Sequence, residues 1–471
     1  MTLETIPPYD PHATPSIRDA ALVLGGGVAG LITARVLADV YERVTVVERD
    51  PITSRPHDRR GLPQSDHVHA LLEAGRATLE DLFPGYTNDV RDRGGTLIDA
   101  GSDFQYFHEG DFLANGHRPL PMLCASRGCF EAVIRDSVCA LPNVTVRDEH
   151  TFRSYELGSH DRVTGVTAID PHGVSRTFDA DLVVDATGRA SRTPRWLEEN
   201  GFAVPHTDEV VIDLTYTTTK IPRSADDTRG FLIAPNPSLL RGGTAVPIEG
   251  DRWVVTLFGL HGDAPPTTRD GFTAFADSLP TAVLHDLLDA VELRGQIHQY
   301  PFPSSRRHRY ERLETFPDGL LVTGDAVASF NPIYGQGMSV AALEALQLHH
   351  TLVKDGAENL AVRFFDRIAE PLDIIWRMTI SADFRLDETS GPRPRGTDLM
   401  NRYMTRLIRT AHNDPVVTDQ FARVLRLERK PTALLRPRLA ARVLLPRPLS
   451  RRLLGRANTT EPPATESLQA R

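Results

Sequence analysis

The residues best placed to do chemistry lie in a glycine-rich turn between two apolar runs, within residues 22–50. Gly25, Gly27 and Gly30 stand in the spacing G-x-G-x-x-G. In this motif the first glycine permits a tight turn, the second lets the backbone approach a pyrophosphate, and the third lets a helix pack closely on a strand. Glu48 follows at the offset expected of a carboxylate that accepts a hydrogen bond from a ribose hydroxyl. The sequence therefore predicts a dinucleotide site, whereas a glycine turn of another α/β protein is the plain alternative.

A second stretch suited to ligand binding covers residues 319–339. An apolar run delivers Gly324 and Asp325 to the end of the predicted sheet, where ligands bind in such folds. Asp325 can accept hydrogen bonds from sugar hydroxyls, although an ordinary helix cap would use the same residue. The turn that follows contains Pro332, Gly335 and Gly337. Its backbone can lie close to a flat ring, and the helix after it would point its positive end toward that ring.

Hydrophobic periodicity predicts the elements that must position these turns. Buried strands are expected at residues 21–24, 44–47, 144–146, 182–184 and 319–323, and helices at 31–37, 127–141 and 338–353. A strand at 104–107, a β-meander over 151–178, an alternating apolar pattern over 210–300 and helices from 359 to 456 complete the chain. The predicted fold class is α/β, with a Rossmann-like domain, a mainly antiparallel substrate sheet and a C-terminal helical region.

The Rossmann-like domain is expected to be discontinuous, because its strands come from distant parts of the chain. We assign residues 19–102, 125–205 and 301–358 to the cofactor-binding domain, and residues 103–124 and 206–300 to the substrate domain. Residues 359–457 form the helical region. Residues 1–18 and 458–471 are polar and are expected to be flexible.

Composition narrows the class of protein. The 471 residues allow two or three structural parts, and 40% hydrophobic with 24% charged residues is typical of a globular enzyme. The net charge of −9 disfavours nucleic acid as a partner. No apolar run is long enough for a transmembrane segment, and the polar N-terminus does not resemble a signal peptide. Three cysteines without metal-ligand spacing predict reduced thiols, no metal site and a cytoplasmic location.

Several motifs together resemble one protein family. They are LGGGVAG at 24–30, VVERD at 46–50, RRGLPQSDHVHALL at 59–72, ASR at 125–127, DATGR at 185–189 and GLLVTGDAVASFNPIYGQGMS at 319–339. With them the chain resembles the flavoprotein monooxygenases of the para-hydroxybenzoate hydroxylase fold. It is most similar to the flavin-dependent epoxidases of bacterial polyether polyketide pathways and their actinobacterial relatives.

The resemblance implies FAD in a domain of the glutathione reductase type. The glycine turn would hold the pyrophosphate, Glu48 the adenosine ribose, and Arg127 and Asp325 the ribityl and phosphate oxygens. Gly337 and Met338 would lie along the isoalloxazine. The expected cofactor-binding set is Gly25, Gly27, Val28, Ala29, Gly30, Glu48, Arg49, Arg60, Arg127, Asp185, Gly188, Gly324, Asp325, Pro332, Gly335, Gly337 and Met338. His67 and His69 could line the flavin edge or serve structural hydrogen bonds, and Arg127 could be a surface arginine.

One departure concerns the electron donor. Single-component hydroxylases of this fold usually carry an Asp–Gly motif that serves both FAD and NADPH, whereas this chain reads Asp185–Ala186–Thr187–Gly188. A single glycine fingerprint also argues against a second dinucleotide domain. NADPH or NADH is therefore expected to supply electrons either directly or through a partner flavin reductase.

The resemblance implies insertion of one oxygen atom from O₂ into a hydrophobic natural-product intermediate, through a flavin 4a-hydroperoxide. Epoxidation and hydroxylation both stay open, and no side chain is expected to be an obligatory acid or base because the flavin carries the chemistry. A FAD-dependent reductase of prenyl or alkene double bonds is the main alternative. Halogenation lacks its tryptophan motif, hydrolysis lacks a G-x-S-x-G elbow, and a flavin carrier without turnover is the non-enzyme alternative.

The basic stretch over residues 423–456 has two interpretations. Its arginines alternate with Leu and Val, as in surface helices that pack an apolar stripe. It could instead bind a membrane surface, an acidic partner or a substrate carrier protein.

Overall fold

Five strands form a parallel sheet in the computed structural model, which describes residues 4, 6–13, 17–52, 63–293, 295–355 and 359–445. The strand order is β17-β11-β1-β2-β7, and every neighbouring pair is parallel. The bounds are β1 Arg18–Leu24, β2 Tyr41–Val47, β7 Val144–Arg147, β11 Leu182–Asp185 and β17 Leu320–Val322. These apolar strands suit a sheet that is covered on both faces.

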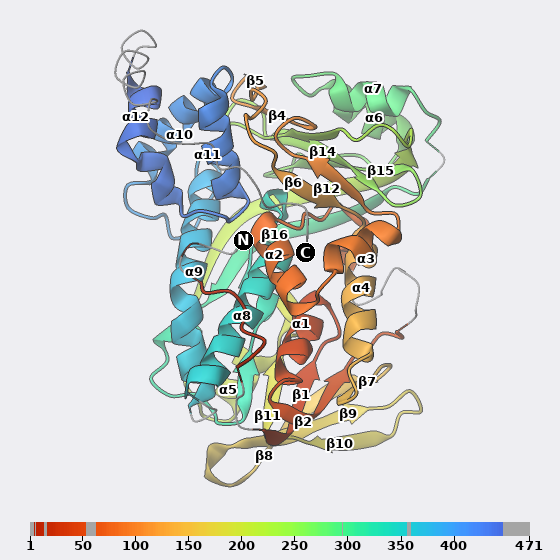
Figure 1. Ribbon diagram of the computed structural model, residues 1–471, viewed down its shortest axis with the longest axis vertical. Coiled ribbons are helices and arrows are strands. Elements are labelled where there is room, and N and C mark those ends of the chain that lie inside the picture. The colour runs from red at the N-terminus through yellow and green to blue at the C-terminus, as the bar shows by residue number, and fades with distance from the viewer. Residues whose placement is uncertain are drawn as a thin grey trace.

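Helices cover one face of this sheet and a second small sheet covers the other (Figure 1). The covering helices are α1 Val28–Leu37, α4 Arg127–Cys139 and α8 Gly337–Asp355, and α1 packs on both α4 and α8. α2 Glu73–Leu82 packs on α8, and α3 Tyr86–Asp92 packs on α4. The small antiparallel sheet contains β8 Thr151–Leu157, β9 Val163–Ile169 and β10 Ser175–Asp179. Val163 and Val166 of β9 pack against Leu22 and Val183 of the parallel sheet. The predicted α/β fold class and the β-meander are confirmed.

An eight-stranded sheet lies at the other end of the molecule (Figure 1). Its order is β18-β16-β12-β15-β14-β13-β4-β5, and all pairs are antiparallel except β13 with β4. The bounds are β4 Phe104–His108, β5 Asp111–Phe112, β12 Thr207–Pro222, β13 Gly230–Ile233, β14 Arg241–Ile248, β15 Arg252–Gly259, β16 His298–His308 and β18 Ala328–Ser329. α6 (Arg269–Asp277) and α7 (Val283–Asp289) cover one face with Phe272 and Leu284. The other face is free to line a site.

The remaining elements close the molecule around this sheet. β3 (Thr96–Asp99) and β6 (Pro121–Cys124) form a two-stranded antiparallel sheet, and α5 (Thr193–Glu199) follows β11. The C-terminal helices are α9 Leu360–Asp383, α10 Thr397–Ala411, α11 Pro415–Leu425 and α12 Pro437–Leu444. α9 runs from the parallel sheet toward the eight-stranded sheet, and α10 to α12 lie beside β4 and β5 (Figure 1). Within the described ranges, no helix is long and apolar enough to cross a membrane.

Two expectations about boundaries differ from the structure. β16 pairs with β12 and continues to His308, past the expected domain boundary between residues 300 and 301. The sequence does not indicate this strand, because Pro301, Pro303 and a polar run interrupt the alternating apolar pattern. Part of the N-terminal segment expected to be flexible is packed. Ile6 is 4% exposed, and the Tyr9 hydroxyl donates a 2.7 Å hydrogen bond to Asp39 after α1.

Part of the basic C-terminal stretch is internal rather than solvated. The Arg426 guanidinium is buried, donates to Glu428 at 2.8 Å and to Glu73 of α2 at 3.3 Å, and also reaches the Leu120 carbonyl at 3.1 Å. Arg423 pairs with Glu428 at 3.1 Å. Arg426 therefore joins the helical region to α2 and to the residue before β6, whereas residues 446–456 lie outside the described part of the chain.

Candidate cofactor and substrate site

One continuous cavity of about 910 Å³ connects the glycine turn with the free face of the eight-stranded sheet. Its volume is near the upper end of small-molecule sites, about 300–1,000 Å³. One end is lined by β1, α1 and the end of β2. The other is enclosed by β4, β12 to β16 and the helices α9 and α11. Two distinct chemical environments therefore share one space.

The glycine turn leaves the start of α1 open to the cavity. Gly25 has φ +100°, and a Cβ there would lie 2.6 Å from the Ala186 carbonyl oxygen. Among the described residues, a Cβ on Gly27 would meet only the Arg127 Nη2 atom, at 3.8 Å. In the part of the chain that the structure describes, no side chain caps α1, and the first N–H groups of such a helix can bind an anion. Val28 and Ala29 also line this end.

Glu48 closes the turn and faces the same end of the cavity. Its Oε2 accepts a 2.6 Å hydrogen bond from the Gly26 N–H, and its Oε1 accepts one of 2.9 Å from the Asp50 N–H. Each carboxylate oxygen can accept further hydrogen bonds. Arg49, His150 and Phe152 lie around it on the cavity wall.

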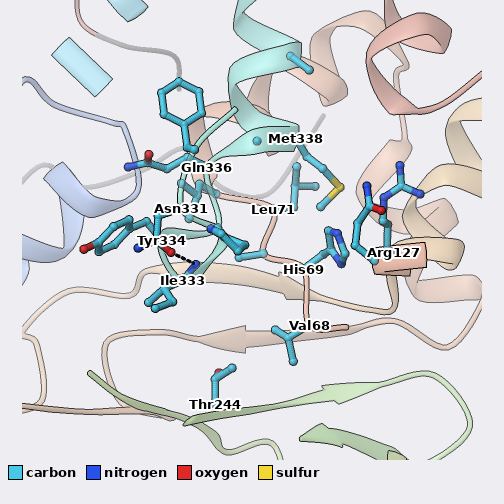
Figure 2. A pocket seen from close by; sticks show the side chains of 18 of the residues that line it. Val68, His69, Leu71, Arg127, Thr244, Asn331, Ile333, Tyr334, Gln336 and Met338 are labelled. Atoms are coloured by element: carbon cyan, nitrogen blue, oxygen red, sulfur yellow. Dashed lines mark hydrogen bonds between the residues drawn. The ribbon is translucent and has the colours of Figure 1, made fainter. Parts of the chain in front are cut away.

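Arg127 brings a positive charge to the glycine turn. It is the first residue of α4, it is buried, and its Nη1 donates a 2.7 Å hydrogen bond to Glu131. His69 lies beside it at the cavity wall (Figure 2). Burial, together with Arg127, lowers the pKa of His69 to about 3, so its imidazole is neutral at pH 7. Arg127 therefore supplies the cationic group at this wall.

The two histidines differ in position. His69 lines the cavity, whereas the buried His67 hydrogen bonds to Thr218 of β12 at 2.6 Å and is not part of the wall. The His67 carbonyl meets the His69 Nδ1 at 2.9 Å. The structural role considered for His67 thus fits its contacts, and His69 fits a cavity-lining role.

The segment from β17 to α8 forms the opposite wall. Most of its residues are buried, but Asp325, Pro332 and Gly337 are exposed to the cavity. Burial within the protein raises the pKa of the Asp325 carboxyl, and the charges of Arg127 and Arg189 oppose that rise. A Cβ on Gly337 would meet only the Asp325 Oδ1 atom, at 3.8 Å. These three residues form an uncovered surface that a bound group would contact.

The loop Asn331–Gly337 keeps its shape through two local constraints. Gly335 has φ +63°, and a Cβ there would lie 2.6 Å from the Ala70 Cβ. The Asn331 Oδ1 accepts a 3.0 Å hydrogen bond from the Ile333 N–H (Figure 2). Met338 then enters α8 and points toward Leu71 across the cavity (Figure 2).

The structure does not bring three predicted residues to the cavity wall. The Asp185 carboxylate is buried, and the Thr187 N–H and three hydroxyls donate to it, from Thr187, Ser191 and Thr193, at 2.5–2.9 Å. A Cβ on Gly30 would lie 1.8 Å from the Gly25 carbonyl oxygen, and one on Gly324 would lie 2.8 Å from the Ala29 Cβ. All three residues therefore stabilise the turns without lining the cavity themselves. Gly188 does line the cavity, and Arg60 lies outside the described residues.

Sequence reasoning missed Arg189 among the arginines that line the cavity. Arg189 follows Gly188, donates to Ser329 at 2.5 Å and to Ser304 at 2.8 Å, and stacks 4.8 Å over the Phe302 ring. Its partners are residues of β16 and β18, which are far from it in sequence. Only its position in the DATGR motif could have indicated a role. It joins the Asp325 wall to the eight-stranded sheet.

The far part of the cavity is an apolar chamber with a polar end. Side chains of the eight-stranded sheet and of α11 line it, among them Tyr216, Leu232, Val246, Phe258, Phe302 and Phe421. At the polar end, Arg385 forms an ion pair with Glu109 and contacts the His108 Nε2 at 3.1 Å. Burial and Arg385 lower the pKa of His108 to about 3. The chamber therefore offers a hydrophobic space with Arg385 at its polar end.

Residues 18–356 match the FAD binding domain family. The chain belongs to this family. Protein Rv3254 of Mycobacterium tuberculosis is 33% identical over 422 residues, which cover 86% of this chain and 89% of that protein. Kynurenine 3-monooxygenase of Salinispora tropica is 25% identical over 373 residues, covering 75% and 77%. The solved structure of PqsL, a probable FAD-dependent monooxygenase from Pseudomonas aeruginosa, covers 79% of this chain and 97% of its own, with 19% identity and a TM-score of 0.60.

These comparisons place the chain among the flavin-dependent monooxygenases, as predicted. The residues present fit FAD on three observations. The turn at Gly27 has room for a group where a Cβ would be, the uncapped start of α1 and Arg127 suit a pyrophosphate, and Asp325 with Gly337 leaves an uncovered surface. The closer similarity to polyether epoxidases has no support beyond the shared family.

Proposed function

We propose that this FAD-dependent monooxygenase inserts one oxygen atom from O₂ into a hydrophobic small molecule, by epoxidation of an alkene or by hydroxylation. The observation that carries the proposal is the continuity of the cavity. The glycine turn, Arg127 and the Asp325 wall lie at one end, and an apolar chamber begins at the Asn331–Gly337 loop. A substrate in that chamber would meet a cofactor held by the first group of residues.

The cofactor-binding roles are part of the proposal. The first N–H groups of α1 and Arg127 would bind the pyrophosphate, Glu48 the adenosine ribose, and Asp325 the ribityl chain. Gly337 and Met338 would lie along the isoalloxazine, and the start of α8 would place a positive dipole end there. Bound FAD would supply electron transfer to O₂, while the side chains orient the substrate and exclude water.

The apolar walls of the chamber suit a substrate with a bulky apolar body. These walls carry aromatic and aliphatic side chains, and Arg385, paired with Glu109, also lines the cavity. The guanidinium is a hydrogen-bond donor only, so it suits a carbonyl, enol or carboxylate oxygen. We therefore propose a natural-product intermediate of polyketide type, and a carrier-bound form of it remains an outcome to be tested.

The reductant is proposed from the sequence. NADPH or NADH would provide electrons directly or through a partner flavin reductase, and the departure from the Asp–Gly motif at Asp185–Gly188 supports the partner route. Three free cysteines, two of them buried, support a cytoplasmic location.

The test is an ¹⁸O₂ experiment. The FAD-loaded protein, supplied with NADPH or with a flavin reductase, is incubated with polyene and aromatic polyketide substrates, and products are analysed by mass spectrometry. Incorporation of one ¹⁸O atom supports the proposal. A hydrogenated product formed under nitrogen would instead support the reductase alternative, and failure to bind FAD would contradict both.

A further inference from the structure

The last two turns of α9 hold the loop that faces the proposed flavin. The Asp383 Oδ1 atom accepts hydrogen bonds from the Asn331 amide at 2.8 Å and from the Tyr334 hydroxyl at 3.0 Å. One turn earlier, the Thr379 hydroxyl donates to the Gln336 Oε1 at 2.6 Å. Asn331, Tyr334 and Gln336 all belong to the loop shown in Figure 2. The C-terminal helical region therefore contacts the loop at three of its side chains.

Asp383 is unusual among these contacts because it is a buried carboxyl. It is 2% exposed, and its Oδ2 has no hydrogen-bond partner among the residues that the structure describes. An unpaired carboxylate oxygen in such a place is costly. Burial accordingly raises the pKa of Asp383 to about 7, although the two donors lower it. A neutral carboxyl would retain Oδ1 as the acceptor for both loop residues.

The surrounding charges do not give Asp383 another function. Arg385 lies two residues further along the chain, but its guanidinium is directed to Glu109 and His108. Asp325 lies at the Gly337 end of the loop, and Tyr106 of β4 interacts electrostatically with Tyr334. Burial raises the pKa of both tyrosine hydroxyls. Asp383 therefore acts on the loop through hydrogen bonds rather than through an ion pair with the described residues.

We propose that Asp383 is a positioning residue, which fixes the Asn331–Gly337 loop against the isoalloxazine by accepting the hydrogen bonds of Asn331 and Tyr334. The inference rests on the proposed function, because it needs FAD to lie along this loop. It assigns the C-terminal helical region a part in the reaction that neither the glycine motif nor the apolar sheet indicates. A displaced loop would leave O₂ reduction possible but would release hydrogen peroxide in place of oxygenated product.

Two substitutions of the same residue separate positioning from acid–base chemistry. Asp383→Asn keeps one acceptor oxygen and has the shape of the neutral carboxyl, whereas Asp383→Ala removes the acceptor. Asp387→Ala is the matched control, because Asp387 is an exposed carboxylate just after α9. Tyr334→Phe removes one donor and leaves the carboxyl in place, so it tests the same contact if Asp383→Ala does not fold.

The first readout is hydrogen–deuterium exchange of residues 331–337 in the protein without FAD. Asp383→Ala should exchange there roughly tenfold faster, since two hydrogen bonds are lost, and Tyr334→Phe less so. Asp383→Asn and Asp387→Ala should keep most of the protection. Unchanged exchange in both Asp383→Ala and Tyr334→Phe would overturn the proposal whether or not the protein oxygenates any substrate.

The second readout uses the FAD-loaded protein. The FAD dissociation constant and the fraction of reductant that ends as hydrogen peroxide should both rise in Asp383→Ala and return toward the original values in Asp383→Asn. If Asp383→Asn keeps the protected loop but loses oxygenation across all pH values, Asp383 is an acid–base residue and the positioning role is wrong. If the unaltered protein releases only peroxide with every substrate, the proposed function fails while the exchange result still stands.

Discussion

The Oε2 atom of Glu48 accepts a 2.6 Å hydrogen bond from the backbone N–H of Gly26. The carboxylate at the end of β2 thus closes the glycine turn that begins α1. Within the described ranges, the three atoms nearest to a Cβ on Gly26 all belong to Glu48, at 3.2–3.4 Å. The same side chain that is expected to bind a ribose therefore also fixes the turn that is expected to bind the pyrophosphate. Cofactor affinity and local rigidity should depend together on this residue.

Glu48→Gln is expected to weaken FAD binding about 10- to 100-fold, because charge-assisted hydrogen bonds contribute roughly 1.5–3 kcal/mol. Its single acceptor oxygen cannot serve both the Gly26 and Asp50 N–H groups and also a ribose. Fluorescence titration of FAD measures the change. Glu42→Gln, on the exposed side of the same strand, is the control and should bind FAD normally. If Glu48→Gln binds FAD with normal affinity, Glu48 does not bind the adenosine ribose.

Two glycines should respond to substitution in opposite ways. Gly337→Leu adds a side chain where only the Asp325 Oδ1 lies within 4 Å, so the FAD-free protein should keep its melting temperature while FAD retention is lost. Gly30→Ala places a Cβ 1.8 Å from the Gly25 carbonyl oxygen, which should cost about 1–3 kcal/mol of the free energy of unfolding.

Thermal unfolding with and without added FAD measures both effects. The Gly337 variant should show no rise in melting temperature with FAD, whereas the Gly30 variant should already melt early without it. If Gly337→Leu still binds FAD and oxygenates substrate, the flavin does not lie along this loop.

Most residues of the predicted cofactor set line the cavity, because local spacing determines where they lie. The glycines, Glu48 and Asp325 stand at strand ends, and hydrophobic runs locate those strands. Arg189 and Asp383 could not be found in this way, because their partners come from β16, β18 and the loop before α8, which only tertiary packing brings together. The predicted pattern also ends at residue 300, eight residues before the end of β16, because Pro301 and Pro303 interrupt its apolar alternation. Local motifs thus indicate the cofactor, and long-range contacts build the chamber.

A buried glutamate should make stability depend on pH. Glu344 of α8 accepts hydrogen bonds from the Thr323 hydroxyl and the Gly324 N–H, and burial raises its pKa to about 7. The folded protein therefore holds a proton that the unfolded chain loses above its ordinary glutamate pKa. The contribution of the protonated Glu344 to the free energy of unfolding is fully present below that ordinary pKa and is lost as the pH rises to about 7.

Glu344→Gln is neutral at every pH and keeps an acceptor for the Gly324 N–H. At pH 8 its free energy of unfolding should exceed that of the unaltered protein by on the order of 2 kcal/mol, and at pH 5 the difference should be smaller. Asp383→Asn should behave in the same direction. A difference that does not grow with pH would mean that Glu344 stays ionised in the folded protein.

Filling the apolar chamber should separate substrate binding from cofactor binding. Ala234 follows β13, is 8% exposed and lines the chamber away from the glycine turn. Ala234→Phe should raise the KM for a bulky substrate roughly tenfold, because overpacking costs about 1–3 kcal/mol, and should leave the FAD dissociation constant unchanged. Ala225→Phe, on an exposed turn beside the same sheet, is the control. If Ala234→Phe lowers FAD affinity and KM stays constant, the flavin reaches this part of the cavity and the substrate must bind elsewhere.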